Sequence, residues 1–115
     1  DAAAQGRALQ WTLWAAAELE PNTSGIARLK RLGGDGAQAR IAENLENAHI
    51  LLKLPEQRLA QSAHLASDAF TVADLNLASI VNLAGFFGVE MARFPRLSAW
   101  MDAARARPAF QKVYG

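Results

Sequence analysis

The stretch FTVADLN at residues 70–76 decides how the middle of this chain folds, because it has the signature of a helix that begins inside a protein core. Thr71 can serve as the N-cap, its hydroxyl accepting from the backbone N–H of Asp74, while the Asp74 carboxylate reaches back to the N–H of Thr71. Phe70 and Leu75 can close over this turn as a hydrophobic staple. Such a capping box satisfies N–H groups that water cannot reach, so we predict a structural role for Thr71 and Asp74.

The residues after this cap predict a buried helix. LNLASIVNLAGFFG, at residues 75–88, is apolar on nearly every side, and a helix of that kind belongs in the centre of a fold. Gly88 is expected to end it. The helix also holds polar side chains that we expect to bond to the backbone or to one another, namely Asn76, Ser79 and Asn82.

The chain before residue 37 predicts a helix, a turn and a second helix. Asp1 can cap a helix from Ala2 to about Glu20, and Pro21 should end or kink it, because the proline nitrogen has no hydrogen to donate to the preceding turn. A turn-rich patch, a short basic helix and a glycine-rich break should follow, at residues 21–25, 26–32 and 33–36.

A second long helix is expected over residues 37–63. Its apolar stripe has helical spacing and consists of Ile41, Leu45, Ala48, Leu52, Leu59 and Ala63. Pro55 interrupts it, and a proline inside a regular helix costs about 3 kcal/mol. We therefore expect a bend or short break between Leu51 and Pro55, with Glu56 in the first turn of the second half.

Two shorter helices complete the predicted fold. One should start after Pro95, and the other should cover residues 108–113. The first has an amphipathic stripe formed by Leu97, Trp100, Met101 and Ala104. Five or six helices without a convincing strand make an all-α helical bundle, and 115 residues fit a single domain over residues 1–115.

The composition argues against several functions. The 12 basic and 11 acidic residues leave a net charge of +1, which gives no electrostatic reason to expect nucleic acid or an anionic membrane as a partner. Cysteine is absent, and His49 and His64 have no cluster of possible ligands around them in the sequence. We therefore expect neither a thiolate nucleophile nor a metal site.

Three stretches together resemble the C-terminal helical domain of cytosolic glutathione transferases. They are FTVADLNLAS at 70–79, FPRLSAWMDAARARPAFQKV at 94–113 and QWTLWAAAELEP at 10–21. Their order and spacing fit nearly all of the chain. The resemblance implies a helical domain that supplies the floor of a hydrophobic-substrate pocket and part of a dimer interface.

The same resemblance implies a second domain that this chain does not contain. Family members have an N-terminal thioredoxin-like domain, which activates the glutathione thiol through a Tyr, Ser or Cys and makes most of the glutathione contacts. We therefore expect an isolated C-terminal domain, or one cut from a longer protein, that is inactive alone and has no catalytic residue. In the bacterial beta class a His and a Lys stand where this chain has Glu20 and Pro21, so a mechanism through that His is not expected.

The first helix holds the candidates for substrate contact, which are Arg7, Trp11, Trp14 and Glu18. Trp11 and Trp14 could line an apolar pocket, pack in the core or meet a second subunit. Arg7 could meet a glutathione carboxylate from a neighbouring subunit. Arg7 and Glu18 also fit an ordinary solvated helix surface.

Two functions remain open from the sequence. In the first, the protein is a cytoplasmic, homodimeric glutathione transferase-like enzyme, in which the glutathione thiolate attacks a small apolar electrophile that this domain positions. In the second, the chain is a non-catalytic protein-interaction module of the same fold. The two tryptophans of the first helix favour the first function.

Overall fold

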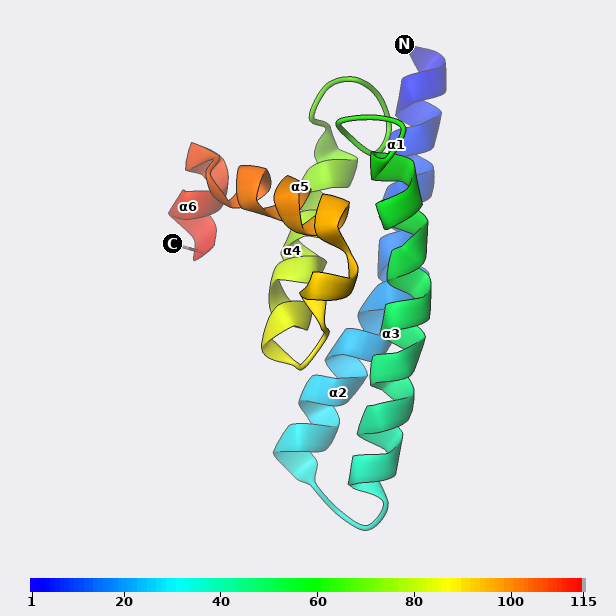
Figure 1. The fold of residues 1–115 in the computed structure, drawn as a ribbon, viewed down its shortest axis with the longest axis vertical. Coiled ribbons are helices and arrows are strands. Elements are labelled where there is room, and N and C mark those ends of the chain that lie inside the picture. Colours follow the sequence, from blue (N-terminus) through cyan, green and yellow to red (C-terminus); the bar gives the residue numbers. More distant parts are fainter. Residues whose placement is uncertain (115) are drawn as a thin grey trace.

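Residues 1–114, which the computed structural model describes, fold into α-helices without a β-strand (Figure 1). The six helices are α1 (Ala2–Trp14), α2 (Glu20–Leu32), α3 (Ala37–Leu59), α4 (Val72–Phe86), α5 (Pro95–Arg105) and α6 (Pro108–Tyr114). The predicted all-α class and the predicted number of helices are confirmed. Within this range, none of the helices combines the length and the apolarity that a membrane crossing requires.

The first two helices are continuous along the chain, because a π-helical turn, Ala15–Leu19, joins α1 to α2. The Glu20 N–H donates to the carbonyl of Ala15, and this wide turn ends at Leu19, two residues before Pro21. Pro21 therefore stands in the first turn of α2, where a helix tolerates proline. Residues 20–25 are helical, so the predicted helix end at Glu20 and the predicted turn at residues 21–25 are wrong. The alternative, a kink at Pro21, stays a prediction.

The third helix runs through its proline without a break. Pro55 is buried inside α3, in line with the fully buried Ala48 and Leu52 of the predicted stripe. Burial along this stripe offsets the hydrogen bond that the proline removes. Of the predicted bend or short break between Leu51 and Pro55, the break is therefore wrong and the bend stays a prediction. The helix ends at Leu59, four residues before the predicted end.

The start of α4 has the predicted capping box. The Thr71 hydroxyl oxygen accepts from the Ala73 N–H at 3.2 Å, and Asp74 Oδ2 accepts from the Thr71 N–H at 2.9 Å. The helix ends at Phe86, and Gly88 just beyond it has a φ of 103°, a conformation that glycine adopts without strain.

Only one face of α4 is buried. The buried residues are Ala73, Asp74, Leu77, Ala78, Val81 and Ala84. The opposite face exposes Val72, Leu75, Leu83 and Phe86. The prediction that this helix is buried on nearly every side is therefore wrong for the described residues. A staple between Phe70 and Leu75 stays a prediction.

Helix α5 runs across the long helices, and its buried face is part of the main hydrophobic core (Figure 1). Its predicted stripe is fully buried, as shown by the low exposure of Leu97, Trp100, Met101 and Ala104. Its first N–H groups are capped from α3, because the Glu56 carboxylate accepts from Arg96 N at 3.2 Å and from Leu97 N at 2.9 Å. Glu56 therefore serves the start of another helix and does not begin a new one after Pro55.

Candidate functional site between α1 and α3

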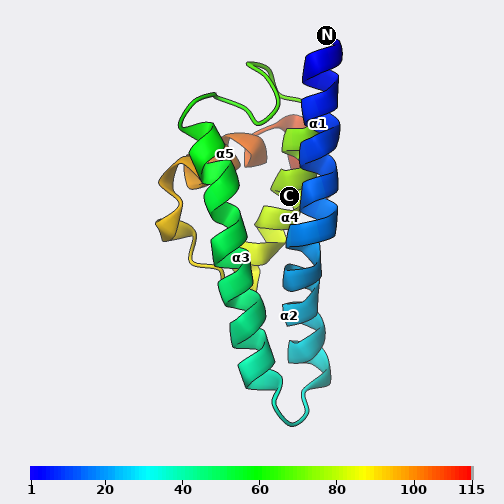
Figure 2. The ribbon, with the colours of Figure 1, turned by 90° about the vertical axis from the view of Figure 1, so that its right-hand side faces the viewer.

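The space between α1 and α3 holds an open groove. The two helices spread apart toward the N-terminal end of α1, and α4 lies behind them (Figure 2). Side chains from both helices line two adjoining hollows of about 230 and 250 Å³. The first is lined by Gln10, Trp11, Trp14 and Leu54, and the second by Trp11, Leu54, Gln57, Arg58 and Gln61.

Two tryptophans form the α1 wall of this groove. The ring centroids of Trp11 and Trp14 lie 5.5 Å apart with the planes at 81°, an edge-to-face arrangement. Both rings also pack in part against the main core, which fixes their positions. Leu54 on the α3 wall is 48% exposed. An apolar wall that remains open to solvent suits a small apolar ligand with a ring.

The other two residues predicted for substrate contact lie apart from the groove. Arg7 Nε donates to the carbonyl of Ala66 at 2.6 Å, which ties α1 to the loop before α4. Glu18 is exposed on the π-helical turn and lines neither hollow. The structure therefore brings Trp11 and Trp14 together but not Arg7 and Glu18. Substrate contact by any of the four stays a prediction.

Sequence reasoning missed the α3 wall. Its apolar member, Leu54, lies one turn after Ile50, and both are about half exposed, at 48% and 54%. Of this apolar pair, Leu54 lines the groove and Ile50 lines a different hollow, so the spacing indicates exposed apolar surface on α3 but does not by itself identify the groove. At the polar end of the groove, Arg58 Nε donates to the carbonyl of Leu65 at 2.8 Å, so that guanidinium is committed to the loop.

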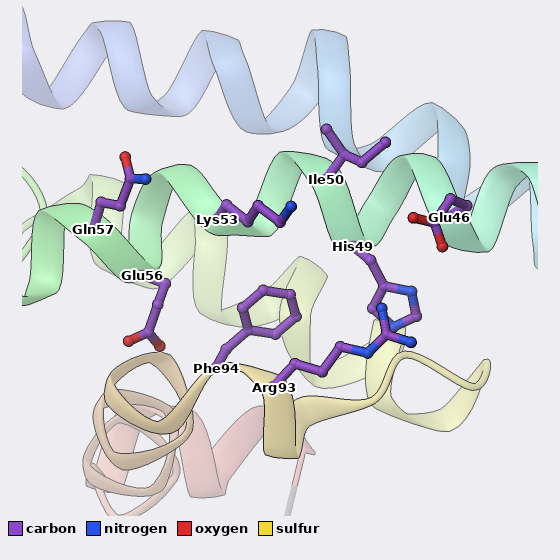
Figure 3. Close-up of a pocket in the computed structure, with 8 residues that line it drawn as sticks. All are labelled: Glu46, His49, Ile50, Lys53, Glu56, Gln57, Arg93 and Phe94. Atoms are coloured by element: carbon purple, nitrogen blue, oxygen red, sulfur yellow. The ribbon is translucent and has the colours of Figure 1, made fainter.

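A further hollow of about 250 Å³ lies between α3 and the segment just before α5 that carries Arg93 and Phe94 (Figure 3). Three of its polar residues make contacts that serve the fold. Glu56 caps α5, His49 Nε2 accepts from the Glu90 N–H at 2.9 Å, and Arg93 pairs with the Glu90 carboxylate at 2.9 Å. The His49 ring also stacks on Phe94, with the centroids 6.2 Å apart. We therefore assign this hollow a structural role.

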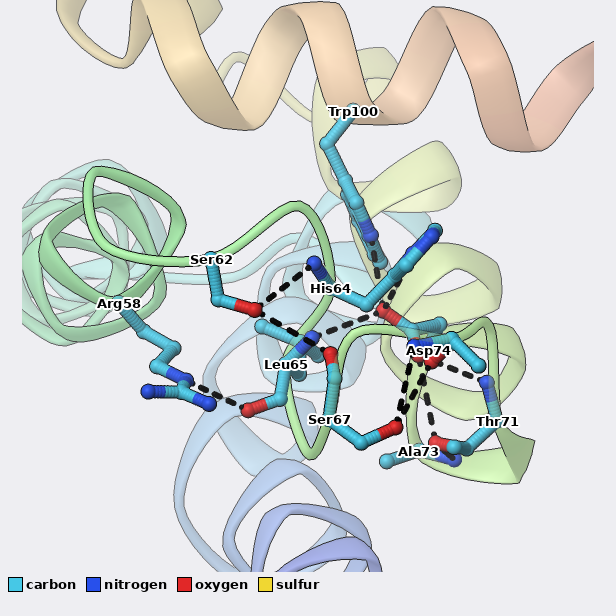
Figure 4. A network of polar contacts seen from close by, with 10 residues as sticks. Arg58, Ser62, His64, Leu65, Ser67, Thr71, Ala73, Asp74 and Trp100 are labelled. Atoms are coloured by element: carbon cyan, nitrogen blue, oxygen red, sulfur yellow. Dashed lines mark hydrogen bonds and ion pairs between the residues drawn. The ribbon is translucent and has the colours of Figure 1, made fainter.

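The Asp74 carboxylate is the centre of a buried polar cluster (Figure 4). Its Oδ1 accepts from Leu65 N at 3.1 Å and from Trp100 Nε1 at 2.9 Å, and its Oδ2 accepts the cap bond from Thr71. His64 Nδ1 lies 3.7 Å from Oδ1. One carboxylate therefore joins the loop, α4 and α5, and this geometry leaves neither Thr71 nor Asp74 free for chemistry.

The polar side chains of α4 also bond within the fold. Ser79 donates to a backbone carbonyl of its own helix at 3.0 Å, as predicted. Asn76 donates to the Thr12 hydroxyl of α1 at 3.3 Å, and Asn82 accepts from Arg105 Nε of α5 at 3.0 Å. These two asparagines join neighbouring helices, so the prediction that they bond to the backbone or to each other is wrong.

This fold is that of a known protein family. A family model described as the glutathione S-transferase C-terminal domain matches residues 15–108. The match covers most of the chain and includes the capping box. The chain therefore belongs to the glutathione S-transferase C-terminal domain family.

Particular relatives are similar to this chain over part of their length. Glutathione S-transferase 4 of Zea mays is 36% identical over 84 residues, which cover 71% of this chain and 38% of the relative. Glutathione S-transferase 3 of Zea mays is 39% identical over 86 residues, with the same two shares of 71% and 38%. The chain thus spans less than half the length of these curated relatives.

A solved structure shows the same arrangement of helices. A glutathione transferase from Burkholderia graminis, solved with two glutathione molecules bound per subunit, matches with a TM-score of 0.86 at 25% identity. The match covers 97% of this chain and 50% of that one. The helices described above are therefore those of a glutathione transferase C-terminal domain.

Proposed function

We propose that this chain is the C-terminal helical domain of a glutathione transferase-like enzyme, and that its α1–α3 groove supplies the apolar floor for an electrophilic substrate. The observation that supports this proposal is the wall of Trp11 and Trp14, which lines an open hollow with Leu54. Family membership supports the reaction class, and the relative solved with glutathione bound supports glutathione as the co-substrate.

In this proposal the chain positions the electrophile while a thioredoxin-like domain holds glutathione and stabilises its thiolate. The thiolate sulfur attacks an electrophilic carbon, a carbon–sulfur bond forms, and the leaving group departs with the electron pair of its bond. The groove contributes by holding the electrophile in one orientation, which removes rotational and translational freedom before the reaction. The edge-to-face pair of Trp11 and Trp14 offers a rigid apolar surface for that purpose.

We also propose that the protein works as a homodimer in the cytoplasm. Leu9 and Leu13 lie one turn apart on α1 and are 60% and 59% exposed, so they form an apolar stripe that a second copy could cover. Light scattering of the purified protein measures the oligomeric state. A dimer that Leu9→Gln with Leu13→Gln converts to a monomer supports the proposal, and a monomer at every concentration contradicts it.

The catalytic proposal is tested by joining this chain to the part of Zea mays glutathione S-transferase 3 that it does not cover. We expect the fusion to conjugate glutathione to an aryl halide and the chain alone to show no turnover above the uncatalysed rate. Trp14→Ala in the fusion should raise the KM for the aryl halide several-fold, because it removes one wall of the hollow.

The matched control is Leu32→Ala, which removes a 71% exposed leucine of α2 that lines neither hollow. Its KM should equal that of the unchanged fusion. Turnover by the chain alone, or equal KM values in the Trp14→Ala and Leu32→Ala fusions, would contradict the proposal.

A non-catalytic interaction module is the second candidate, and the exposed face of α4 favours it. Val72 and Phe86 on that face are 59% and 77% exposed, which is unusual for large apolar side chains of an isolated domain. This candidate predicts that the fusion folds and stays inactive toward every electrophile, while Phe86→Gln abolishes binding to a protein partner. An active fusion decides for the enzyme.

A further inference from the structure

A separate pocket lies beside the start of α4, where the loop before α4 meets α5 and the start of α6. Its volume is about 380 Å³, within the range of roughly 300–1,000 Å³ that is typical of small-molecule sites. Two aromatic rings, Phe70 and Trp100, and alanines at the end of α5 form its apolar lining. Its polar members are His64 and Arg107. The pocket shares no residue with the α1–α3 groove.

The Arg107 guanidinium stacks on an aromatic ring, and this contact leaves its N–H groups free of the ring. Its central carbon lies 3.6 Å from the centroid of the Phe70 ring, a cation–π contact that fixes the plane of the guanidinium. The structure records no hydrogen bond or ion pair of this guanidinium with the rest of residues 1–113. Because stacking uses the face of the group, its N–H edges remain available to a carboxylate, which they match in geometry.

The acidic groups around the pocket do not cancel this positive charge. Asp74 is completely buried, and its oxygens accept from the backbone and from the Trp100 indole. His64, with Nδ1 3.7 Å from that carboxylate, is part of the wall between Asp74 and the pocket. Asp102, also on α5, pairs with Arg105 at 3.4 Å. The accessible charge of the pocket is therefore that of Arg107.

We propose that this pocket binds a small planar aromatic carboxylate. The carboxylate pairs with the edge of the Arg107 guanidinium, and the aromatic ring packs among Phe70, Trp100 and the alanines of α5. A ring without a charge would leave the guanidinium without its partner, and an aliphatic carboxylate would forgo the aromatic contacts. This site is distinct from the groove of the proposed function, so the two proposals are tested independently.

The test is a titration of the purified protein with naphthoate, followed by NMR of the tryptophan indole N–H signals. Trp100 lines the pocket, whereas Trp11 and Trp14 line the groove, so each site has its own reporter. We expect naphthoate to shift the Trp100 signal in a saturable way and to leave the other two unchanged. Naphthylmethanol, which has the same rings without the charge, should bind about tenfold more weakly or worse.

Two variants probe the two halves of the pocket. Arg107→Gln should weaken naphthoate about tenfold while leaving naphthylmethanol unchanged. Ala103→Leu, at an exposed helical position that lines the pocket, should weaken both compounds because the larger side chain fills the space. Arg28→Gln is the matched control, since it removes the same charge from an exposed site on α2 that does not line the pocket.

Three results would overturn the proposal. They are equal naphthoate affinity in the Arg107→Gln and Arg28→Gln proteins, a shift confined to Trp11 and Trp14, and no saturable shift of Trp100 at all. The second of these results would place the ligand in the α1–α3 groove. None of these results tests the activity of the fusion protein described above. A failure of the pocket proposal therefore does not contradict the proposed function.

Discussion

The Asp74 cluster and the α1–α3 groove differ in the kind of side chain they contain and in its exposure to solvent. In the cluster, a carboxylate with no exposed surface accepts from Leu65, Thr71 and Trp100. In the groove, Trp14 and Leu54 present apolar surface to an open hollow. The carboxylate of the first region is buried and fully hydrogen-bonded, whereas the apolar side chains of the second region remain open to solvent.

This difference separates the residues that hold the fold from the residues that can hold a ligand. Removing a partner from the closed cluster leaves buried N–H groups without acceptors, which costs stability. Removing the half-exposed Leu54 from the open groove exposes little new surface, so stability should change little while ligand binding suffers. Variants in the two regions should therefore move different observables.

Asp74→Ala should have the largest effect on stability. It leaves the N–H groups of Leu65 and Thr71 and the Trp100 indole N–H without their acceptor, and a buried unsatisfied donor costs about 1–3 kcal/mol. We expect a loss of at least about 3 kcal/mol in the free energy of unfolding, measured by urea titration.

The control for this variant is Asp68→Ala, which removes an exposed carboxylate from the same loop. It should change the free energy of unfolding by less than about 0.5 kcal/mol. If Asp74→Ala and Asp68→Ala unfold at the same urea concentration, the cluster does not hold the fold and the comparison of the two regions fails.

Thr71→Ala should have the next largest effect, because it removes the hydroxyl oxygen that accepts from Ala73 while the Asp74 carboxylate remains. A lost N-cap costs roughly 0.5–2 kcal/mol, and we expect the upper half of that range at this partly buried helix start. Thr71→Ser keeps the hydroxyl and should stay close to the unchanged protein. A serine variant as unstable as the alanine variant would show that the methyl group, not the cap, stabilises α4.

Glu56→Ala tests a cap that comes from another helix. The Glu56 carboxylate accepts from Arg96 N and Leu97 N at the start of α5, so its removal should cost about 1 kcal/mol. Glu43→Ala, on an exposed face of the same helix, is the control and should be nearly neutral. If both variants unfold at the same urea concentration, water hydrogen-bonds to these N–H groups as well as Glu56 does, and the cap contributes no stability.

The features that follow from local spacing could be predicted from the sequence. The Thr71–Asp74 capping box and the buried stripe of Leu97 and Met101 depend on residues three or four apart, and both are present. Gly88 at the end of α4 is a similar case, because its positive φ is a local requirement. Such features need no knowledge of the tertiary fold.

The features that depend on contacts between distant segments could not be predicted. The bond from Trp100 to Asp74 joins residues 26 apart, and the cap from Glu56 to Leu97 joins residues 41 apart. The predicted helix end before Pro21 and the predicted break before Pro55 are wrong for a related reason. A π-helical turn before Pro21 and burial around Pro55 keep their helices intact, and neither can be read from the propensity of proline itself.

Leu54→Ala should have the smallest effect on stability and is the sharpest test of the comparison. Leu54 is 48% exposed, so truncation loses little buried area, and we expect a change of at most about 0.5–1 kcal/mol in urea. The same variant in the fusion protein should raise the KM for an aryl halide, because Leu54 lines both hollows of the groove. Leu32→Ala, at 71% exposure outside the groove, should leave both quantities unchanged. If Leu54→Ala destabilises the protein as much as Thr71→Ala does, the groove is part of the structural core. Its role as a ligand surface would then lose its support.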